Sequence, residues 1–228
     1  MGYPMSQSRT KSLANDYVSI ALKNYSEMKE KYETLRLQDT DLDAIFDYNL
    51  IYQKRIIATG FSQMAIEAFV NDYAAACLGD NEFYDNFDKL SVDGKLQLVS
   101  TFIINDRLNK NSVMYANIKA LKRQRNEFIH SKSYILEESE MKNCSMKEEE
   151  YYLSYDERIN ITYKNLLERI KDDLDEVKKA VKALIDIANY FDSHDENVLA
   201  TLELFGYFRI PDIIKEDLKE MGLNYNEI

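Results

Sequence analysis

The sequence predicts an all-α protein, an up-and-down helical bundle of four to five core helices followed by short C-terminal helices. Two observations predict this fold class. The 228 residues include only six glycines and two prolines, whereas these two residue types make up about 12% of an average chain, and turn-rich sandwiches and barrels depend on them. Apolar residues form 45% of the chain and recur at three- and four-residue steps, which is typical of amphipathic helices.

Helix boundaries follow from the few capping and helix-breaking residues. Gly79 ends the second helix, and Ser91 suits the N-cap of the third. Residues 80–87 are expected to be a short acidic and aromatic connection, and residues 137–155 an exposed loop, because their charges lack periodicity. The expected helices cover residues 12–37, 41–78, 91–105, 112–131, 157–191, 198–205 and 211–221.

The charge of the chain is unevenly distributed. We expect one helical domain over residues 1–228, with residues 192–228 as a C-terminal helical cap. The net charge of −11 argues against a protein whose whole surface binds nucleic acid. Residues 107–132 nevertheless carry seven basic side chains and one acid, Glu127, so this segment is +6 and the remainder −17. Such a basic island suits phosphate binding, although pairing with the acidic residues of 137–150, or basic side chains that simply stay solvated, would also account for it.

The chain offers few residues for cofactor chemistry. Cys77, Cys144, His130 and His194 are its only cysteines and histidines, which excludes a structural zinc site and a disulfide framework. Glycine-rich nucleotide motifs and the common catalytic motifs are absent. We therefore expect no cofactor and no metal. Two isolated thiols and the lack of a long apolar run predict a cytoplasmic protein without a membrane span.

The helix expected at residues 112–131 carries the clearest functional pattern. At 100° per residue, Arg125 falls in the middle of its apolar face, although an arginine keeps its charge and needs a partner when it is desolvated. Asn126 and His130 lie one turn apart on a neighbouring flank that is basic and hydrogen-bonding. The apolar face itself is formed by Met114, Ile118, Leu121, Phe128 and Ile129.

Residues 125–130, Arg-Asn-Glu-Phe-Ile-His, resemble the R-N-x-x-x-H form of the motif of the HEPN superfamily, helical proteins that include RNase toxins and phage-defence nucleases. Upstream, residues 65–72 are similar to the long early helix of that family, with its polar Glu and Asn. Residues 87–96 resemble its L-S-x-x-x-K-L helix start, with Gly94 in place of the commoner acidic residue. The resemblance covers a HEPN-like core at about residues 40–191.

The resemblance implies a metal-independent endoribonuclease. His130 would act as the base on the RNA 2′-OH, Arg125 would hold the charged phosphate, and Asn126 would fix the imidazole ring or bind phosphate. Within the family the motif lies at a dimer interface, so the resemblance implies a homodimer in which Arg125 faces a shared cleft and the apolar stripe is partly dimer surface. The basic residues expected to contact RNA are Lys119, Lys122 and Arg123.

Two residues of the second helix are candidates for a supporting role. Glu67 and Asn71 are four apart and share a face, so they could orient Arg125 or His130. A structural ion pair between glutamate and arginine within the bundle explains Glu67 equally well. Asp72 is a competing partner for Arg125.

The predicted function is that of a toxin or phage-defence endoribonuclease, with RNA as substrate, a second copy of the chain as partner and an antitoxin protein as a further possible partner. Two alternatives stay open. The chain is either a non-catalytic HEPN-like module that binds RNA, a nucleotide or a protein partner, or an unrelated helical interaction protein in which Arg125 and His130 satisfy buried polar groups.

Overall fold

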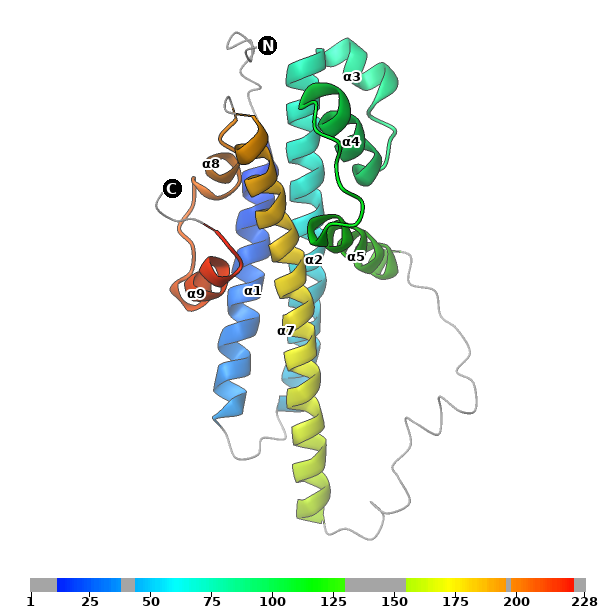
Figure 1. Cartoon of the computed structure of the whole chain (residues 1–228). Coiled ribbons are helices and arrows are strands. Elements are labelled where there is room, and N and C mark those ends of the chain that lie inside the picture. Colours follow the sequence, from blue (N-terminus) through cyan, green and yellow to red (C-terminus); the bar gives the residue numbers. More distant parts are fainter. Residues whose placement is uncertain (1–11, 38–43, 130–154, 196–197, 224–228) are drawn as a thin grey trace, which may run out of the picture.

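A computed structural model describes residues 12–37, 44–129, 155–195 and 198–223. All regular structure within these ranges is helical, which confirms the all-α class (Figure 1). The helices are α1 (Ala14–Arg36), α2 (Ala44–Leu78), α3 (Asp80–Asn86), α4 (Val92–Leu98), the π-helical turn η1 (Val99–Ile103), α5 (Val113–Ile129), α7 (Tyr155–His194), α8 (Ala200–Phe205) and α9 (Asp212–Glu220). None of these helices is both long and apolar enough to cross a membrane.

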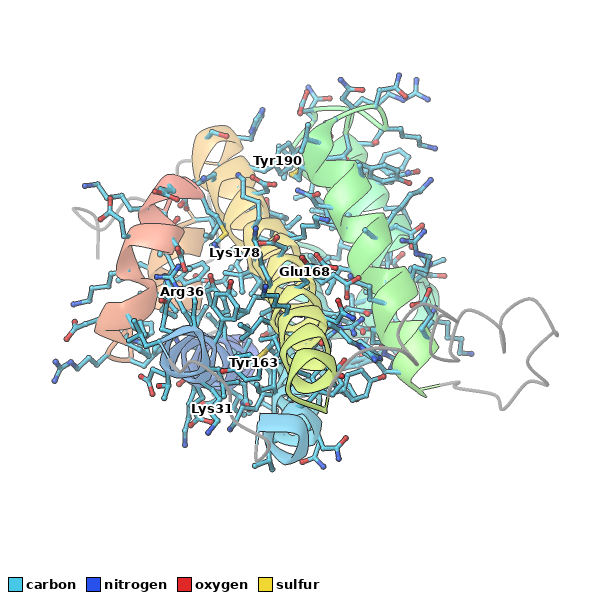
Figure 2. All side chains as sticks on the ribbon, turned by 90° about the horizontal axis from the view of Figure 1, so that it is seen from below. Lys31, Arg36, Tyr163, Glu168, Lys178 and Tyr190 are labelled. Carbon is cyan, nitrogen blue, oxygen red and sulfur yellow. The ribbon has the colours of Figure 1, made fainter. Side chains whose placement is uncertain are left out.

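The core forms where the three longest helices, α1, α2 and α7, lie side by side (Figure 1). Along α7, apolar residues at three- and four-residue steps form a buried stripe, in which Ile170, Val177, Val181 and Leu184 are all inaccessible to solvent. In the view from below, α7 lies between α1 and α9 on one side and α5 on the other (Figure 2). The apolar periodicity of the longest helix therefore predicted its packing correctly.

Two segments differ from the expectation. The acidic connection at residues 80–87 is mostly the helix α3, because Gly79 at a φ of 88° lets α2 end and a new helix begin at once. Phe83 is buried against the core, and the acids Asp80 and Glu82 lie in the first turn, where negative charge is favourable. The next helix changes from α4 to a π-helical turn before Asn105, whose φ is 59°, ends it.

The two short C-terminal helices form as expected and are tied to the bundle by carboxylates. Asp192, near the end of α7, accepts hydrogen bonds from the backbone N–H groups of Ala200 and Thr201, at 2.5 and 3.1 Å, and so caps α8. Asp217 of α9 accepts from the Tyr25 hydroxyl at 2.5 Å and from Lys29 at 2.6 Å, both on α1. These hydrogen bonds connect α8 to α7 and α9 to α1.

Candidate functional site

The apolar face of α5 packs inside the chain, against α2 and α7. Ile118 and Leu121 are 3% and 1% exposed, whereas Met114 and Phe128 are half-buried. The bundle itself buries Ile118 and Leu121, so a dimer surface on this stripe would have to use its half-buried residues, and the dimer stays a prediction. The Ile129 side chain lies outside the described part of the chain.

Arg125 is half-buried and points its guanidinium group at its neighbour. Its Nη1 donates a hydrogen bond to Oδ1 of Asn126 at 3.2 Å. Among the described residues, no carboxylate lies within ion-pair distance of Arg125. An arginine keeps its charge in a protein, and Arg125 is open to solvent in part, so its remaining donors are accessible from outside the described chain.

A shallow hollow of about 510 Å³ lies over the basic flank of α5, and we call it the α5 pocket. Its lining residues are Lys119, Lys122, Arg123, Asn126 and Glu127. All of them lie on the flank that the helical periodicity marks as basic and hydrogen-bonding. The structure thus brings the three lysine and arginine candidates and Asn126 together at one surface.

The cations of the α5 pocket differ in how firmly they are held. Nζ of Lys122 lies 2.6 Å from Oδ1 of Asp93, and Arg123 pairs with Glu127 at 3.7 Å. Partial burial opposes the charge of Asp93, yet the hydrogen bonds from Lys122 and Ser91 lower its pKa, so this carboxylate is ionised at neutral pH. Lys119 instead lies over the ring of Tyr115, 5.0 Å from its centroid, and no described carboxylate pairs with it.

His130 follows the last described residue of α5 and lies outside the described part of the chain. Its role as the base therefore stays a prediction from the sequence. Phe128, two residues earlier, is described and lies below the guanidinium group of Arg55, 5.3 Å from the ring centroid. The last turn of α5 is therefore in contact with α2.

A buried ion-pair cluster holds that contact in place, and sequence reasoning missed it. Arg55 of α2 pairs with Asp173 of α7 at 2.8 Å and also with Glu176. The Tyr48 hydroxyl donates to Asp173 at 3.2 Å. Burial raises the pKa of Asp173 in spite of the neighbouring Arg55. Because Arg55 also contacts the Phe128 ring, this cluster positions the end of α5 that leads into His130.

Glu67 and Asn71 meet Lys95 of α4. Nζ of Lys95 donates to Oδ1 of Asn71 at 2.9 Å and lies 3.8 Å from Oε1 of Glu67. Lys95 is only 2% exposed, and the signal for it was present in the sequence, since it shares the apolar face of Val92 and Leu96. The structure thereby joins the two upstream segments that resemble HEPN proteins, while a role of Glu67 and Asn71 in orienting Arg125 or His130 stays a prediction.

Asp72, the competing partner considered for Arg125, lies close to the C-terminal helices. Burial, followed by the charges of Asp72 and Asp192, raises the pKa of Glu203 on α8. In the described part of the chain, Arg125 instead has Asn126 as its hydrogen-bond partner.

No group of three or more histidine, cysteine or acidic side chains in the described ranges is arranged to hold a metal ion. Comparisons of the chain with family models, with curated proteins and with solved structures find no match.

Proposed function

We propose that this protein is a metal-independent endoribonuclease of the HEPN type, which acts as a homodimer in a toxin or phage-defence role. The observation that carries the proposal is Arg125. It begins the R-N-x-x-x-H motif, bonds to Asn126 at 3.2 Å and has no described carboxylate partner. Its hydrogen-bond partner Asn126 lines the α5 pocket together with three further cations. An anionic substrate would accept hydrogen bonds from the donors of Arg125 that Asn126 does not use.

The proposed reaction is an attack of the RNA 2′-OH on the adjacent phosphorus. His130 accepts the proton of the 2′-OH, a role suited to a side chain whose unperturbed pKa is about 6.5. Arg125 stabilises the negative charge that develops on the phosphorane oxygens, because its planar fork of donors matches them. The P–O5′ bond breaks and the departing O5′ takes up a proton from water, leaving a 2′,3′-cyclic phosphate on one product and a 5′-hydroxyl on the other, while His130 returns its proton to the solvent.

The homodimer would bring two copies of the motif to one cleft. Part of the apolar stripe is buried within the chain, so the dimer surface on α5 must include the half-exposed residues around Arg125. Light scattering at tens of micromolar is expected to give twice the chain mass of 26.7 kDa. A monomer under these conditions would contradict the composite site.

Cleavage of total RNA in the presence of EDTA tests the proposal. His130→Ala is expected to lower the rate by about 10²–10⁴-fold, and Arg125→Ala by about 10²–10³-fold. Arg125→Lys should restore little activity, since a point charge does not replace a planar fork. A substrate with 2′-deoxyribose at the cleavage position should stay intact, because the nucleophile is missing.

His194→Ala is the matched control, because it removes the other histidine of the chain, which is exposed at the end of α7. It should cut RNA at the wild-type rate. Full activity of His130→Ala would show that the nuclease activity comes from another site or a contaminant. Circular dichroism and light scattering must confirm that each inactive variant is folded and has the wild-type mass.

The α5 pocket favours a second candidate, a non-catalytic module that binds RNA. This function requires wild-type protein that binds RNA and cuts none of it. Lys122 and Arg123 are already paired with Asp93 and Glu127, so Lys119→Ala should weaken binding at low salt more than Lys122→Ala does. Equal affinities for wild type and both variants would mean that the flank is only a solvated face.

A further inference from the structure

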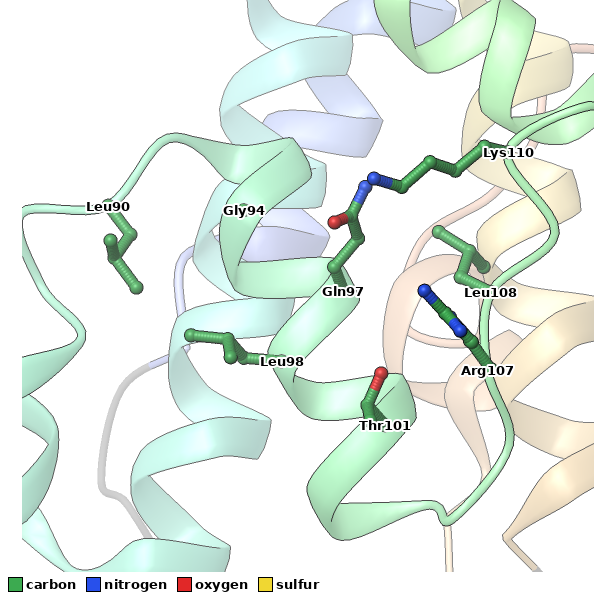
Figure 3. Close-up of a pocket in the computed structure, with 8 residues that line it drawn as sticks. All are labelled: Leu90, Gly94, Gln97, Leu98, Thr101, Arg107, Leu108 and Lys110. Carbon is green, nitrogen blue, oxygen red and sulfur yellow. The ribbon is translucent and has the colours of Figure 1, made fainter.

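A second pocket, of about 430 Å³, lies along α4 and η1, and we call it the α4 pocket. Its wall comes from α4, η1 and the segment that leads to α5 (Figure 3). Its volume falls within the range of small-ligand sites, about 300–1,000 Å³. Leu90 and Leu98 lie on one side of the pocket, and Gln97, Arg107 and Lys110 lie on the other side, where Leu108 is next to Arg107 (Figure 3).

The polar side is positively charged without compensation from the described chain. Arg107 and Lys110 extend from the segment before α5 towards Gln97 of α4 (Figure 3). Both are exposed, and neither forms an ion pair with a described carboxylate. On a chain with a net charge of −11, two cations in one pocket that no described carboxylate neutralises make a local site for an anion.

Gly94 lines the pocket without a side chain, so a substitution at this position can add a charge to the pocket wall. A Cβ at this position would meet Oγ of Ser91 at 3.5 Å and Cβ of Leu90 at 3.8 Å, which is ordinary van der Waals contact. The fold therefore accepts a side chain here. An acidic one would place its charge in the same pocket as Arg107 and Lys110.

The α4 pocket is connected to the α5 pocket through one side chain, Tyr115. Nε2 of Gln97, in the α4 pocket, donates to the Tyr115 hydroxyl at 2.9 Å. Nζ of Lys119, in the α5 pocket, lies 5.0 Å from the centroid of the same ring. Gln97 and Lys119, which line the two pockets, thus contact the same buried tyrosine, so the two pockets lie close together on α4 and α5.

We propose that the α4 pocket binds one nucleotide of a single-stranded RNA whose chain continues along the basic flank of α5. Arg107 and Lys110 hold a backbone phosphate, and an unpaired base packs against the leucine side of the pocket. A strand whose bases are paired could not present a base face to this apolar wall. This inference rests on the proposed function and adds a substrate-binding subsite remote from the motif.

Fluorescence anisotropy with a fluorescein-labelled single-stranded RNA tests the proposal, with every protein in the His130→Ala background so that the strand stays intact. Arg107→Ala together with Lys110→Ala is expected to raise Kd about tenfold or more at low salt. The slope of log Kd against log salt should become shallower by about 0.7 for each phosphate group that the variant no longer binds.

The matched control is Arg209→Ala with Lys215→Ala, which removes the same two charges near α9, on the opposite side of the bundle from α4 (Figure 1). Its Kd should stay near the wild-type value. An equal loss of affinity in both double variants would overturn the proposal, because it would show a general effect of net charge.

Gly94→Glu and Gly94→Gln give a second test that does not depend on removing a residue. Both replacements favour the helix more than glycine does, so neither should unfold the protein. Gly94→Glu should raise Kd above that of Gly94→Gln, since only the glutamate neutralises the pocket. Wild-type affinity in Gly94→Glu would overturn the proposal.

The outcomes separate this inference from the proposed function. RNA binding that depends on Arg107 and Lys110 supports the subsite even if the wild-type protein cuts no RNA. Cleavage that depends on His130, with strand affinity unchanged in the double variant, keeps the nuclease and overturns the subsite. Binding of adenosine monophosphate that the double variant abolishes, without any effect on the strand, would assign the pocket to a free nucleotide and also overturn it.

Discussion

Lys95→Met tests whether the buried ammonium group organises the junction of α2 and α4. Lys95 is 2% exposed, and its Nζ donates to Oδ1 of Asn71 at 2.9 Å and lies 3.8 Å from Glu67. The aromatic face of Phe83, 5.8 Å away, adds a weaker contact. Methionine keeps an unbranched apolar chain but removes the donor, so Asn71 loses its hydrogen bond to a charged group.

The expected cost follows from these contacts. A hydrogen bond from a charged donor contributes about 1.5–3 kcal/mol to stability. The variant loses this bond, but it no longer has to bury a charged ammonium group, and the avoided desolvation cost offsets part of the loss. The Glu67 side chain is 42% exposed, so solvent screens its attraction and its contribution is less than about 1 kcal/mol. We expect Lys95→Met to lower the free energy of unfolding by about 1–2 kcal/mol. Lys95→Ala should cost about 2–4 kcal/mol, because it also leaves a cavity.

Urea unfolding followed by circular dichroism measures these values, and a double-mutant cycle with Asn71→Leu isolates the hydrogen bond. A coupling free energy of about 1 kcal/mol between positions 95 and 71 is expected for residues in direct contact. A coupling free energy near zero, or a Lys95→Met variant as stable as the wild type, would refute a stabilising role for the hydrogen bond between Lys95 and Asn71. Lys89→Met, at an exposed position before α4, is the matched control and should leave stability unchanged.

Two further predictions concern the C-terminal helices. Partial burial opposes the charge of Asp217, yet hydrogen bonds from Lys29 and Tyr25 lower its pKa, so its stabilisation is present above the unfolded pKa of about 3.9 and is lost as pH falls through the lower folded value. Asp217→Asn should therefore lower the free energy of unfolding by about 1–2 kcal/mol at pH 7. The difference in stability between wild type and variant should shrink as the pH falls towards the folded pKa of Asp217, and a difference that does not change with pH would contradict this. Asp192→Ala should lower the free energy of unfolding by about 1 kcal/mol through loss of the α8 cap. The substitution should speed up amide hydrogen exchange more in α8 than in α7.

The arrangement on α5 could be predicted because it depends on local geometry alone. A rotation of 100° per residue puts Lys119, Arg123 and Asn126 on one flank of any regular helix, and the α5 pocket contains all three. The same rotation placed Arg125 on the apolar face, where it is half-buried. Periodicity could not say what Arg125 touches, because its rotamer and its neighbours depend on the packed helices.

Contacts between distant residues could not be predicted. Arg55 and Asp173 are 118 positions apart, and Lys95 and Asn71 are 24 apart. A helical pattern shows which side of each helix is polar, but the rotation and axial shift of one helix against another come from side-chain packing across the whole core. Helical spacing therefore predicted that Glu67 and Asn71 share one face of their helix, but it could not predict that Lys95 lies opposite them.

The sequence by itself determined that this protein is all-helical, where its long helices run and that one basic island lies on an acidic chain. Scarcity of glycine and proline, apolar periodicity and charge counting are local properties, so each is complete before the chain folds. The tertiary structure decided that α3 forms with Phe83 buried against the core, and that Ile118 and Leu121 are buried within the bundle. It alone placed the α4 and α5 pockets on either side of Tyr115, because burial and adjacency are settled only when helices remote in sequence pack together.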